Sequence, residues 1–187
     1  MQLMQLQYSR LSTTRSLLQD PLLNGTKIVL VVRDPRATIT SRLSVGAIRW
    51  SHQQIDHDNS MKLCDNMNSD FDEYIQLSRL YPHRIFIIKY EWLIGAPQAT
   101  IELLFNFLDL PITDAVKQKV VSLGTRDPIT YTPTPSDRQM MVGRANRRFG
   151  VLNTTEIDRI ERDCVALLQR LGYPLSEARA KSVKKMF

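Results

Sequence analysis

Apolar residues gather in two short runs separated by longer, amphipathic stretches. Residues 28–32 read Ile-Val-Leu-Val-Val, and residues 85–90 read Ile-Phe-Ile-Ile-Lys-Tyr. Consecutive apolar positions rich in β-branched residues are typical of parallel strands buried on both faces. Elsewhere apolar residues recur at helical spacing, which predicts helices over residues 35–45, 63–80, 101–108, 114–123 and 154–172. An extended start over residues 3–11 and a helical turn at 16–18 precede the first strand. The pattern predicts an α/β fold of one domain, a parallel sheet flanked by helices.

Two stretches lack any period. Residues 50–60 are polar and contain two histidines and two aspartates, so we expect a loop or a partly helical lid over a binding site. Residues 124–146 are rich in Thr, Pro, Asp and Arg, which predicts a long irregular segment. Long loops inside a compact domain are often functional.

The first strand ends in a charged turn, Arg33-Asp34-Pro35-Arg36. Asp34 suits a helix cap, and Pro35 suits the first helical position. A strand that feeds the N-terminus of a helix offers backbone donors to an anion. The two arginines add charge there, and the hydroxyls of Thr38, Thr40 and Ser41 add neutral donors. The alternative is an ordinary turn that carries surface arginines.

With these residues, segment 27–42 resembles the second nucleotide motif of the carbohydrate sulfotransferases, which take sulfate from 3'-phosphoadenosine 5'-phosphosulfate (PAPS). That motif looks like a strand followed by Arg-Asp-Pro-Arg-Ala, with a serine eight residues after the first arginine. Arg33 and Ser41 match this spacing. The resemblance implies that Arg33 and Ser41 hold the 3'-phosphate of PAPS, and that the fold is the P-loop-NTPase-like fold of sulfotransferases, with residues 1–187 forming its C-terminal part.

Further segments carry the same resemblance in the same order. Tyr90-Glu91-Trp92-Leu93 is similar to a Tyr-Glu-Asp-Leu segment of the family, with Trp92 standing where an acid is usual. Residues 105–108 and the apolar positions of 157–173 resemble the family's later helices. A Trp-Arg pair closes over the nucleotide in the family. This chain has Arg147-Arg148, and we assign Arg148 to that role, with a basic surface loop as the alternative.

The family's first nucleotide motif, a Gly/Ser-rich loop, has no counterpart in this sequence. Thr13-Thr14-Arg15-Ser16 imitates its start, but Leu17 and Leu18 follow where small residues are needed for close backbone approach. The sequence therefore predicts an N-terminally truncated sulfotransferase, whose general base and 5'-phosphosulfate cation lie in the absent part. Glu91 is expected to be a structural carboxylate. The predicted function is sulfuryl transfer from PAPS to a carbohydrate hydroxyl. The alternative is a truncated, non-catalytic protein that keeps only a 3'-phosphate site.

Composition favours anionic ligands without favouring nucleic acid or a metal. The 187 residues carry a formal net charge of +6, with 43% hydrophobic and 24% charged residues. This charge suits a nucleotide sulfate donor and acidic glycans. The basic residues are spread along the chain without interleaved aromatics or zinc spacing, so no nucleic-acid partner is predicted. His52 and His57 have no third ligand nearby, so no metal is predicted.

Three features of the sequence bear on the cellular compartment in which the protein is expected. Asn24-Gly25-Thr26 and Asn153-Thr154-Thr155 are sequons for N-linked glycosylation, which are typical of lumenal surfaces. Cys64 and Cys164 are the only cysteines, and they form either one disulfide or two buried thiols. No apolar stretch approaches the ~20 residues of a membrane span, and no targeting segment is recognisable. The resemblance implies a glycoprotein of the Golgi lumen or membrane, with a membrane anchor in full-length members that this chain does not carry.

Overall fold

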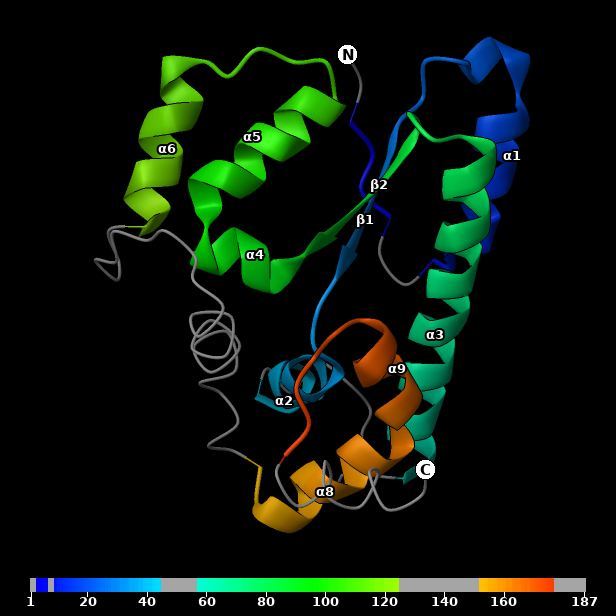
Figure 1. Cartoon of the computed structure of the whole chain (residues 1–187), viewed down its shortest axis with the longest axis vertical. Helices are drawn as coiled ribbons and strands as arrows, with labels where there is room; N and C mark the ends of the chain where they lie inside the picture. Colours follow the sequence, from blue (N-terminus) through cyan, green and yellow to red (C-terminus); the bar gives the residue numbers. More distant parts are fainter. Residues whose placement is uncertain (1–2, 7–8, 45–56, 125–151, 177–187) are drawn as a thin grey trace.

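The computed structural model describes residues 3–6, 9–44, 57–124 and 152–176. Within these ranges the sheet has two parallel strands, β1 (Ile28–Val32) and β2 (Ile85–Lys89), which confirms the predicted parallel pairing and α/β class. The helices are η1 (Leu11–Thr14), α1 (Arg15–Gln19), η2 (Pro21–Leu23), α2 (Pro35–Ser44), α3 (His57–Leu80), α4 (Tyr90–Gly95), α5 (Pro97–Phe107), α6 (Asp114–Gly124), α8 (Thr154–Asp163) and α9 (Val165–Arg170). Figure 1 shows the long helix α3 on one side of the sheet and the α4–α6 group on the other.

One face of the sheet is covered by α1, η1 and α3. Ile28 and Leu30 of β1 point to this face together with Ile85 of β2, because side chains alternate along a strand. The core here contains the buried side chains of Leu11, Leu18, Leu77 and Ile85, with Ile28, Leu30, Tyr74 and Tyr81 packed against it. This cluster fixes the N-terminal turn, the sheet and α3 to one another.

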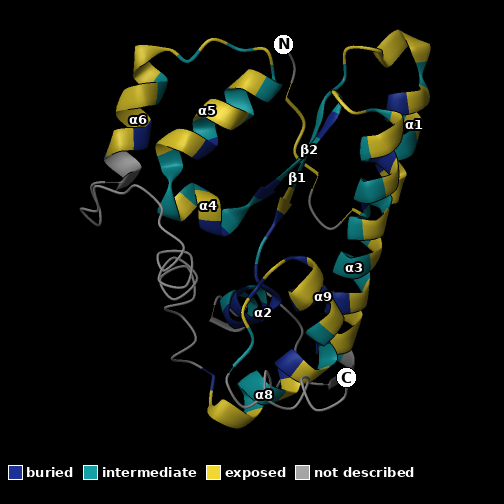
Figure 2. Ribbon diagram, in the orientation of Figure 1, coloured by how far each residue is buried: buried dark blue, intermediate teal, exposed yellow. Residues whose placement is uncertain are grey.

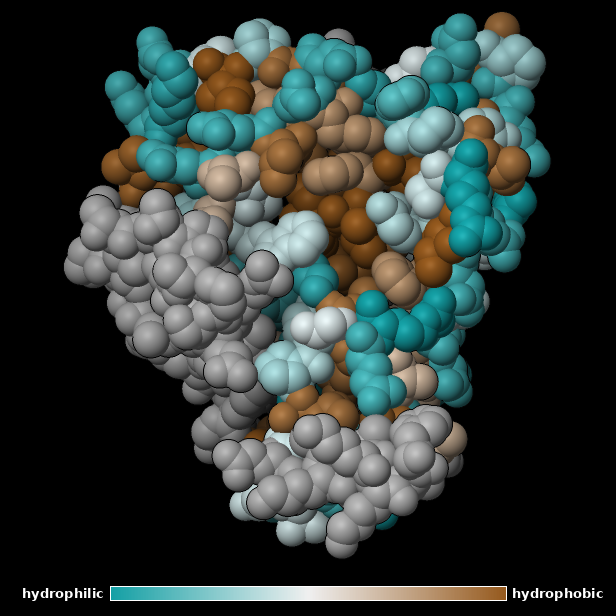
Figure 3. All heavy atoms as spheres, viewed as in Figure 1, coloured by the Kyte–Doolittle hydropathy of each residue, from teal (hydrophilic) through white to brown (hydrophobic). Residues whose placement is uncertain are grey.

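The opposite face of the sheet is covered unevenly. Phe86 of β2 stacks on Phe107 of α5, with ring centroids 5.0 Å apart. Val31 of β1 is 62% exposed, and Leu103 of α5 is 56% exposed. The prediction that residues 28–32 are buried on both faces is therefore wrong within the part of the chain that the structure describes. Figure 2 shows that part of β1 is exposed, and Figure 3 shows apolar side chains gathering in a hollow in the middle of this view.

A second core lies beyond the carboxyl end of the sheet, where α2, α3, α8 and α9 meet. Its buried members are Ile39, Cys64, Leu152, Ile160, Cys164, Leu167, Leu168, Leu171 and Tyr173. The helical spacing of the apolar positions in segment 157–171 anticipated most of them. This core holds α2, and with it the turn at the end of β1, against the C-terminal helices.

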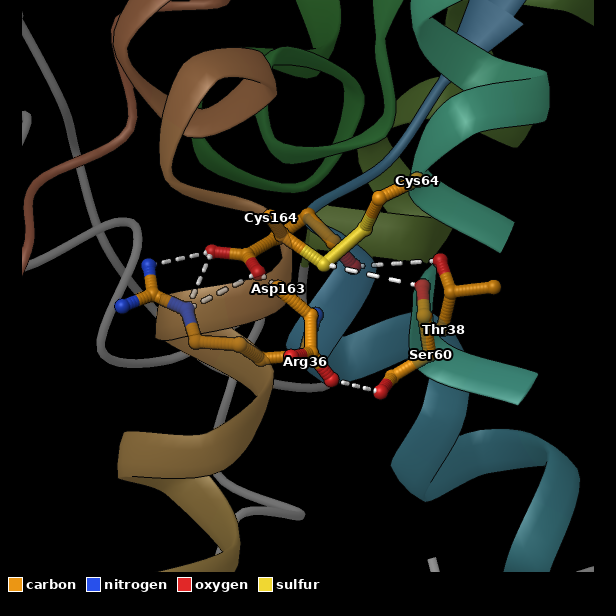
Figure 4. The surroundings of a disulfide bond; sticks show 7 residues. Arg36, Thr38, Ser60, Cys64, Asp163 and Cys164 are labelled. Carbon is orange, nitrogen blue, oxygen red and sulfur yellow. Dashed lines mark hydrogen bonds and ion pairs between the residues drawn. A yellow bond between two sulfur atoms is a disulfide. The ribbon is translucent and has the colours of Figure 1, made fainter. Parts of the chain in front are cut away.

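Cys64 of α3 and Cys164 form a disulfide, which decides between the two alternatives that the sequence left open. The bond closes a loop with a sequence separation of 100 residues. Next to it, the Ser60 hydroxyl donates to the carboxylate of Asp163 (Figure 4). One covalent bond and one hydrogen bond thus join the start of α3 to the junction of α8 and α9.

Several predicted boundaries are wrong for identifiable reasons. The helix expected over 154–172 is two helices, because Cys164 leaves helical geometry at φ −110° and ψ 9°. Helix α5 begins at Pro97, four residues before the expected start, because proline suits the first turn of a helix. It ends at Phe107, and Asp109 just beyond takes a left-handed φ of 55°. Helix α3 begins at His57, six residues before the expected start. The described residues 3–6 and 9–10 belong to neither a helix nor a strand, and Arg10 has the extended backbone expected of the start of the chain.

Most of the predicted lid over residues 50–60, including His52, and most of the predicted irregular segment 124–146 lie outside the described residues. None of the helices in the described ranges combines the length and apolar character needed to cross a membrane.

The disulfide predicts a measurable contribution to stability. Replacing both cysteines, Cys64→Ala and Cys164→Ala, is expected to lower the free energy of unfolding by about 3 kcal/mol, because the cross-link restricts the unfolded chain. Urea unfolding measures the change. Reducing agent should destabilise the parent protein by a similar amount and leave the double variant unaffected. Equal stability of the parent protein with and without reductant would contradict the prediction.

Candidate functional site

The turn between β1 and α2 has the capped geometry that its sequence predicts. The Asp34 carboxylate Oδ1 accepts the backbone N–H of Arg36 at 2.9 Å, and Pro35 is the first residue of α2. An aspartate cap followed by proline satisfies one free N–H and pre-sets the first helical φ. The β1–α2 turn is therefore a defined helix N-terminus at the carboxyl end of the sheet.

Arg36 is buried in this turn and makes ion pairs within the fold. Its side chain is paired with the Asp34 carboxylate, Nη2 to Oδ2 at 2.7 Å, and with the carboxylate of Glu161 from α8. The exposed fractions are 5% for Arg36, 0% for Asp34 and 1% for Glu161. Burial alone lowers the pKa of Arg36, but the hydrogen bonds and charges of Asp34 and Glu161 outweigh burial, so the pKa is raised above its ordinary value. The sequence predicted that Arg33 and Arg36 would both donate to a bound anion. For Arg36 this prediction is wrong, because its guanidinium is paired with the carboxylates of Asp34 and Glu161.

Glu91 ties the same turn to the start of α4, directly after β2. One carboxylate oxygen accepts the backbone N–H of Asp34 at 2.9 Å, and the other accepts the hydroxyl of Tyr173 at 2.8 Å. Burial raises the pKa of Tyr173, and the adjacent Glu91 charge raises it further, so Tyr173 remains a donor. Glu91 is 3% exposed. These contacts confirm the prediction that Glu91 is a structural carboxylate.

Arg33 differs from Arg36 in its surroundings. It is half-buried, and its guanidinium carbon lies 4.5 Å from the centroid of the Tyr90 ring. The Nε atom is buried and has no hydrogen-bond partner among the residues that the structure describes. A buried donor without a partner is costly, and a bound anion would satisfy it. The cation–π contact fixes the guanidinium without neutralising its charge.

Ser41 lies on α2, about two helical turns after the cap. Asp34, Thr38 and Ser41 are spaced i, i+4 and i+7, so they follow one face of the helix. Thr38 and Ser41 are half-buried, and the Thr38 hydroxyl donates to the backbone carbonyl of Asp34 at 3.1 Å. Arg33 and Ser41 therefore belong to one strand–turn–helix unit, Arg33 at its bend and Ser41 along its helix. Arg148 lies outside the described residues.

Two residues that contact the arginines of the turn, Tyr90 and Glu161, were not predicted from the sequence. Tyr90 directly follows β2, and the parallel register places Val32 opposite Lys89, so Arg33 and Tyr90 leave the sheet side by side. Glu161 stands within the apolar stripe of α8, between Ile160 and Cys164. An acid on an otherwise buried helix face signals a buried cation, and Arg36 is that cation.

Together these features define an α/β protein in which a parallel strand enters a capped helix through a turn that carries Arg33. A sequence profile of the sulfotransferase family matches residues 19–114, just over half of the chain, and this range contains Arg33, Ser41 and Glu91. The chain is 28% identical over 193 aligned positions to human carbohydrate sulfotransferase 5, covering 91% of this chain and 45% of that protein. It thus spans less than half of the relative's length. The protein belongs to the sulfotransferase family.

The Arg36–Glu161 pair yields a prediction about stability. Glu161→Gln is expected to lower the free energy of unfolding by about 3 kcal/mol, because it removes one of the two carboxylates that compensate a buried guanidinium. Urea unfolding measures the difference. The matched control is Glu102→Gln, an equal change of charge at an exposed position of α5, with an expected effect within ~0.5 kcal/mol. Similar effects of the two substitutions would show that the buried pair does not secure the turn.

Proposed function

We propose that this protein transfers a sulfuryl group from PAPS to a hydroxyl group of a carbohydrate. The observation that carries the proposal is the Arg33 guanidinium, which is half-buried at a helix N-terminus and whose Nε has no partner within the described part of the chain. Membership of the sulfotransferase family and the similarity to a carbohydrate sulfotransferase support the reaction class and the acceptor. The net charge of +6 suits an anionic donor.

In this proposal Arg33 and Ser41 bind the 3'-phosphate of the nucleotide. The guanidinium supplies charge and paired N–H donors, and the hydroxyl supplies a neutral donor. The N-terminus of α2 adds the positive end of the helix dipole. Arg148 is proposed to close over the nucleotide, and residues 1–187 are proposed to form one sulfotransferase domain with the P-loop-NTPase-like fold.

The proposed reaction is a direct displacement at sulfur. The acceptor oxygen forms a bond to sulfur while the bond between sulfur and the 5'-phosphate oxygen breaks. The acceptor proton passes to a base, and 3'-phosphoadenosine 5'-phosphate leaves. Residues that hold the 3'-phosphate act by positioning the donor in line with the acceptor. Glu91 is not the base, because both of its oxygens already accept hydrogen bonds within the fold.

A second candidate is a protein of the same family that binds the 3'-phosphate without transferring sulfate. The engagement of Glu91 favours it, since the carboxylate adjoining the Arg33 turn is committed to structure. For either candidate we propose a Golgi-lumen location. The buried Cys64–Cys164 disulfide supports this location, because such bonds persist in oxidising compartments.

Binding of 3'-phosphoadenosine 5'-phosphate tests the site. Arg33→Ala is expected to weaken binding by about 10- to 100-fold, because it removes a charge-assisted contact to phosphate. Ser41→Ala should weaken binding by about fivefold, because a neutral hydrogen bond is worth less. Isothermal calorimetry measures both. Arg79→Ala, an equal loss of charge at an exposed position of α3, is the control and should bind normally. Unchanged affinity of Arg33→Ala would refute the assignment.

Transfer of labelled sulfate from PAPS to a panel of glycans tests the reaction. The parent protein is expected to label at least one glycan, and Arg33→Ala should reduce that labelling at least as much as it reduces nucleotide binding. Binding of the nucleotide with no transfer to any glycan, at protein concentrations above the measured dissociation constant, would favour the non-catalytic candidate.

A further inference from the structure

The loop between η2 and β1 exposes a side chain for which the fold shows no use. Asn24 follows η2 and is exposed, with φ −57° and ψ −25°. Its side chain makes no hydrogen bond to the residues that the structure describes. A Cβ atom built on the next residue, Gly25, would meet nothing within 4 Å. The surface around Asn24 is therefore open enough for a bulky group.

The backbone of this loop is held from the inside. The Arg84 guanidinium donates to three backbone carbonyls, those of Leu18 at 2.9 Å, Leu23 at 2.7 Å and Thr26 at 3.0 Å. The Thr26 N–H also donates to the Leu23 carbonyl at 2.9 Å. Because main-chain groups fix the loop, neither the Asn24 side chain nor the Thr26 hydroxyl is needed for its shape.

The second sequon contrasts with the first. Asn153 caps α8, where its Oδ1 accepts the N–H of Glu156 at 2.9 Å and the Glu156 carboxylate accepts the N–H of Asn153 at 2.8 Å. This capping box explains why an asparagine stands at 153. Nothing comparable explains Asn24, although it forms the same kind of triplet with Thr26.

We propose that Asn24 is a site of N-linked glycosylation. The co-reactant is an oligosaccharide carried on a lipid diphosphate. Its anomeric carbon forms a bond to Nδ2 of Asn24 while the bond from that carbon to the diphosphate oxygen breaks. The amide loses one proton, the lipid diphosphate departs, and no atom is oxidised or reduced. The buried disulfide is an independent sign that the chain folds where such donors are present.

The glycan would stand at the end of the sheet opposite the nucleotide site. Asn24 precedes the amino end of β1, and Arg33 follows its carboxyl end. Five strand residues at ~3.3 Å each separate these two ends by about 16 Å. The glycan would instead adjoin Leu22 and Leu23, which are 90% and 38% exposed. The inference shares the proposed lumenal location but does not depend on PAPS binding.

The test isolates Asn24 by removing the other sequon without disturbing its cap. Thr155→Ala destroys the triplet at 153 and keeps the Asn153–Glu156 capping box. The full chain with this substitution is translated behind a cleavable signal peptide in the presence of microsomes, and only the protease-protected fraction is analysed. We expect the mass of the chain to increase by one glycan. Peptide-N-glycosidase should remove the glycan and convert Asn24 to aspartate, and mass spectrometry should locate this conversion at position 24.

Two further variants act at Thr26 in the same background. Thr26→Ala should abolish the shift, and Thr26→Ser should keep it, since serine also completes the triplet. Both retain the main-chain contacts to Arg84. A protected Thr155→Ala chain that glycosidase leaves unchanged would overturn the proposal, as would a shift that survives Thr26→Ala. Affinity for 3'-phosphoadenosine 5'-phosphate should be the same in all of these variants, so failure here and failure of the nucleotide site are separate results.

Discussion

The buried ion pair between Arg36 and Glu161 is the constraint on which the rest of the site depends. It joins a turn at the end of β1 to a helix 125 residues further along the chain. Neither charge can be buried alone without a penalty of several kcal/mol, so the two segments must reach their native positions together. Asp34 completes the cluster from within the turn. Because Arg33 is bonded directly to Asp34, the C-terminal helices also fix the position of Arg33, the residue proposed to bind the 3'-phosphate.

The carboxylates around the turn divide the two arginines into different roles. Asp34 and Glu161 neutralise Arg36, and Glu91 accepts hydrogen bonds from the Asp34 main chain and Tyr173. Arg33 instead lies against the neutral ring of Tyr90. An aromatic partner orients a guanidinium while leaving its charge available, whereas a carboxylate would compete with a bound phosphate. The structure thus separates the arginine that builds the turn from the arginine suited to an anion.

Local pattern was enough to predict the strand, the cap and the helix that carry Arg33 and Ser41. Strand periodicity, an aspartate cap and a proline at the first helical position are all read over a few residues. The different surroundings of Arg33 and Arg36 could not be predicted from local pattern. Arg33 contacts Tyr90 and Arg36 pairs with Glu161, and both partners are remote in sequence. The break between α8 and α9 at Cys164 was hidden for the same reason. The apolar period continues through Cys164, which also bonds to Cys64 across the core.

The two ends of β1 are secured by different means, and this bears on how the chain tolerates change. At the carboxyl end, side-chain charges and a disulfide-linked core hold the turn, so substitutions there act on stability and on the site together. At the amino end, Arg84 holds the loop through main-chain carbonyls and Lys27 ties it to the end of α5, whereas the side chain of Asn24 makes no hydrogen bond to the described residues. A covalent addition at Asn24 would therefore meet little resistance from the fold. The strand between the two ends keeps such an addition away from the turn that carries Arg33, so a group on Asn24 would not alter the surroundings of that residue.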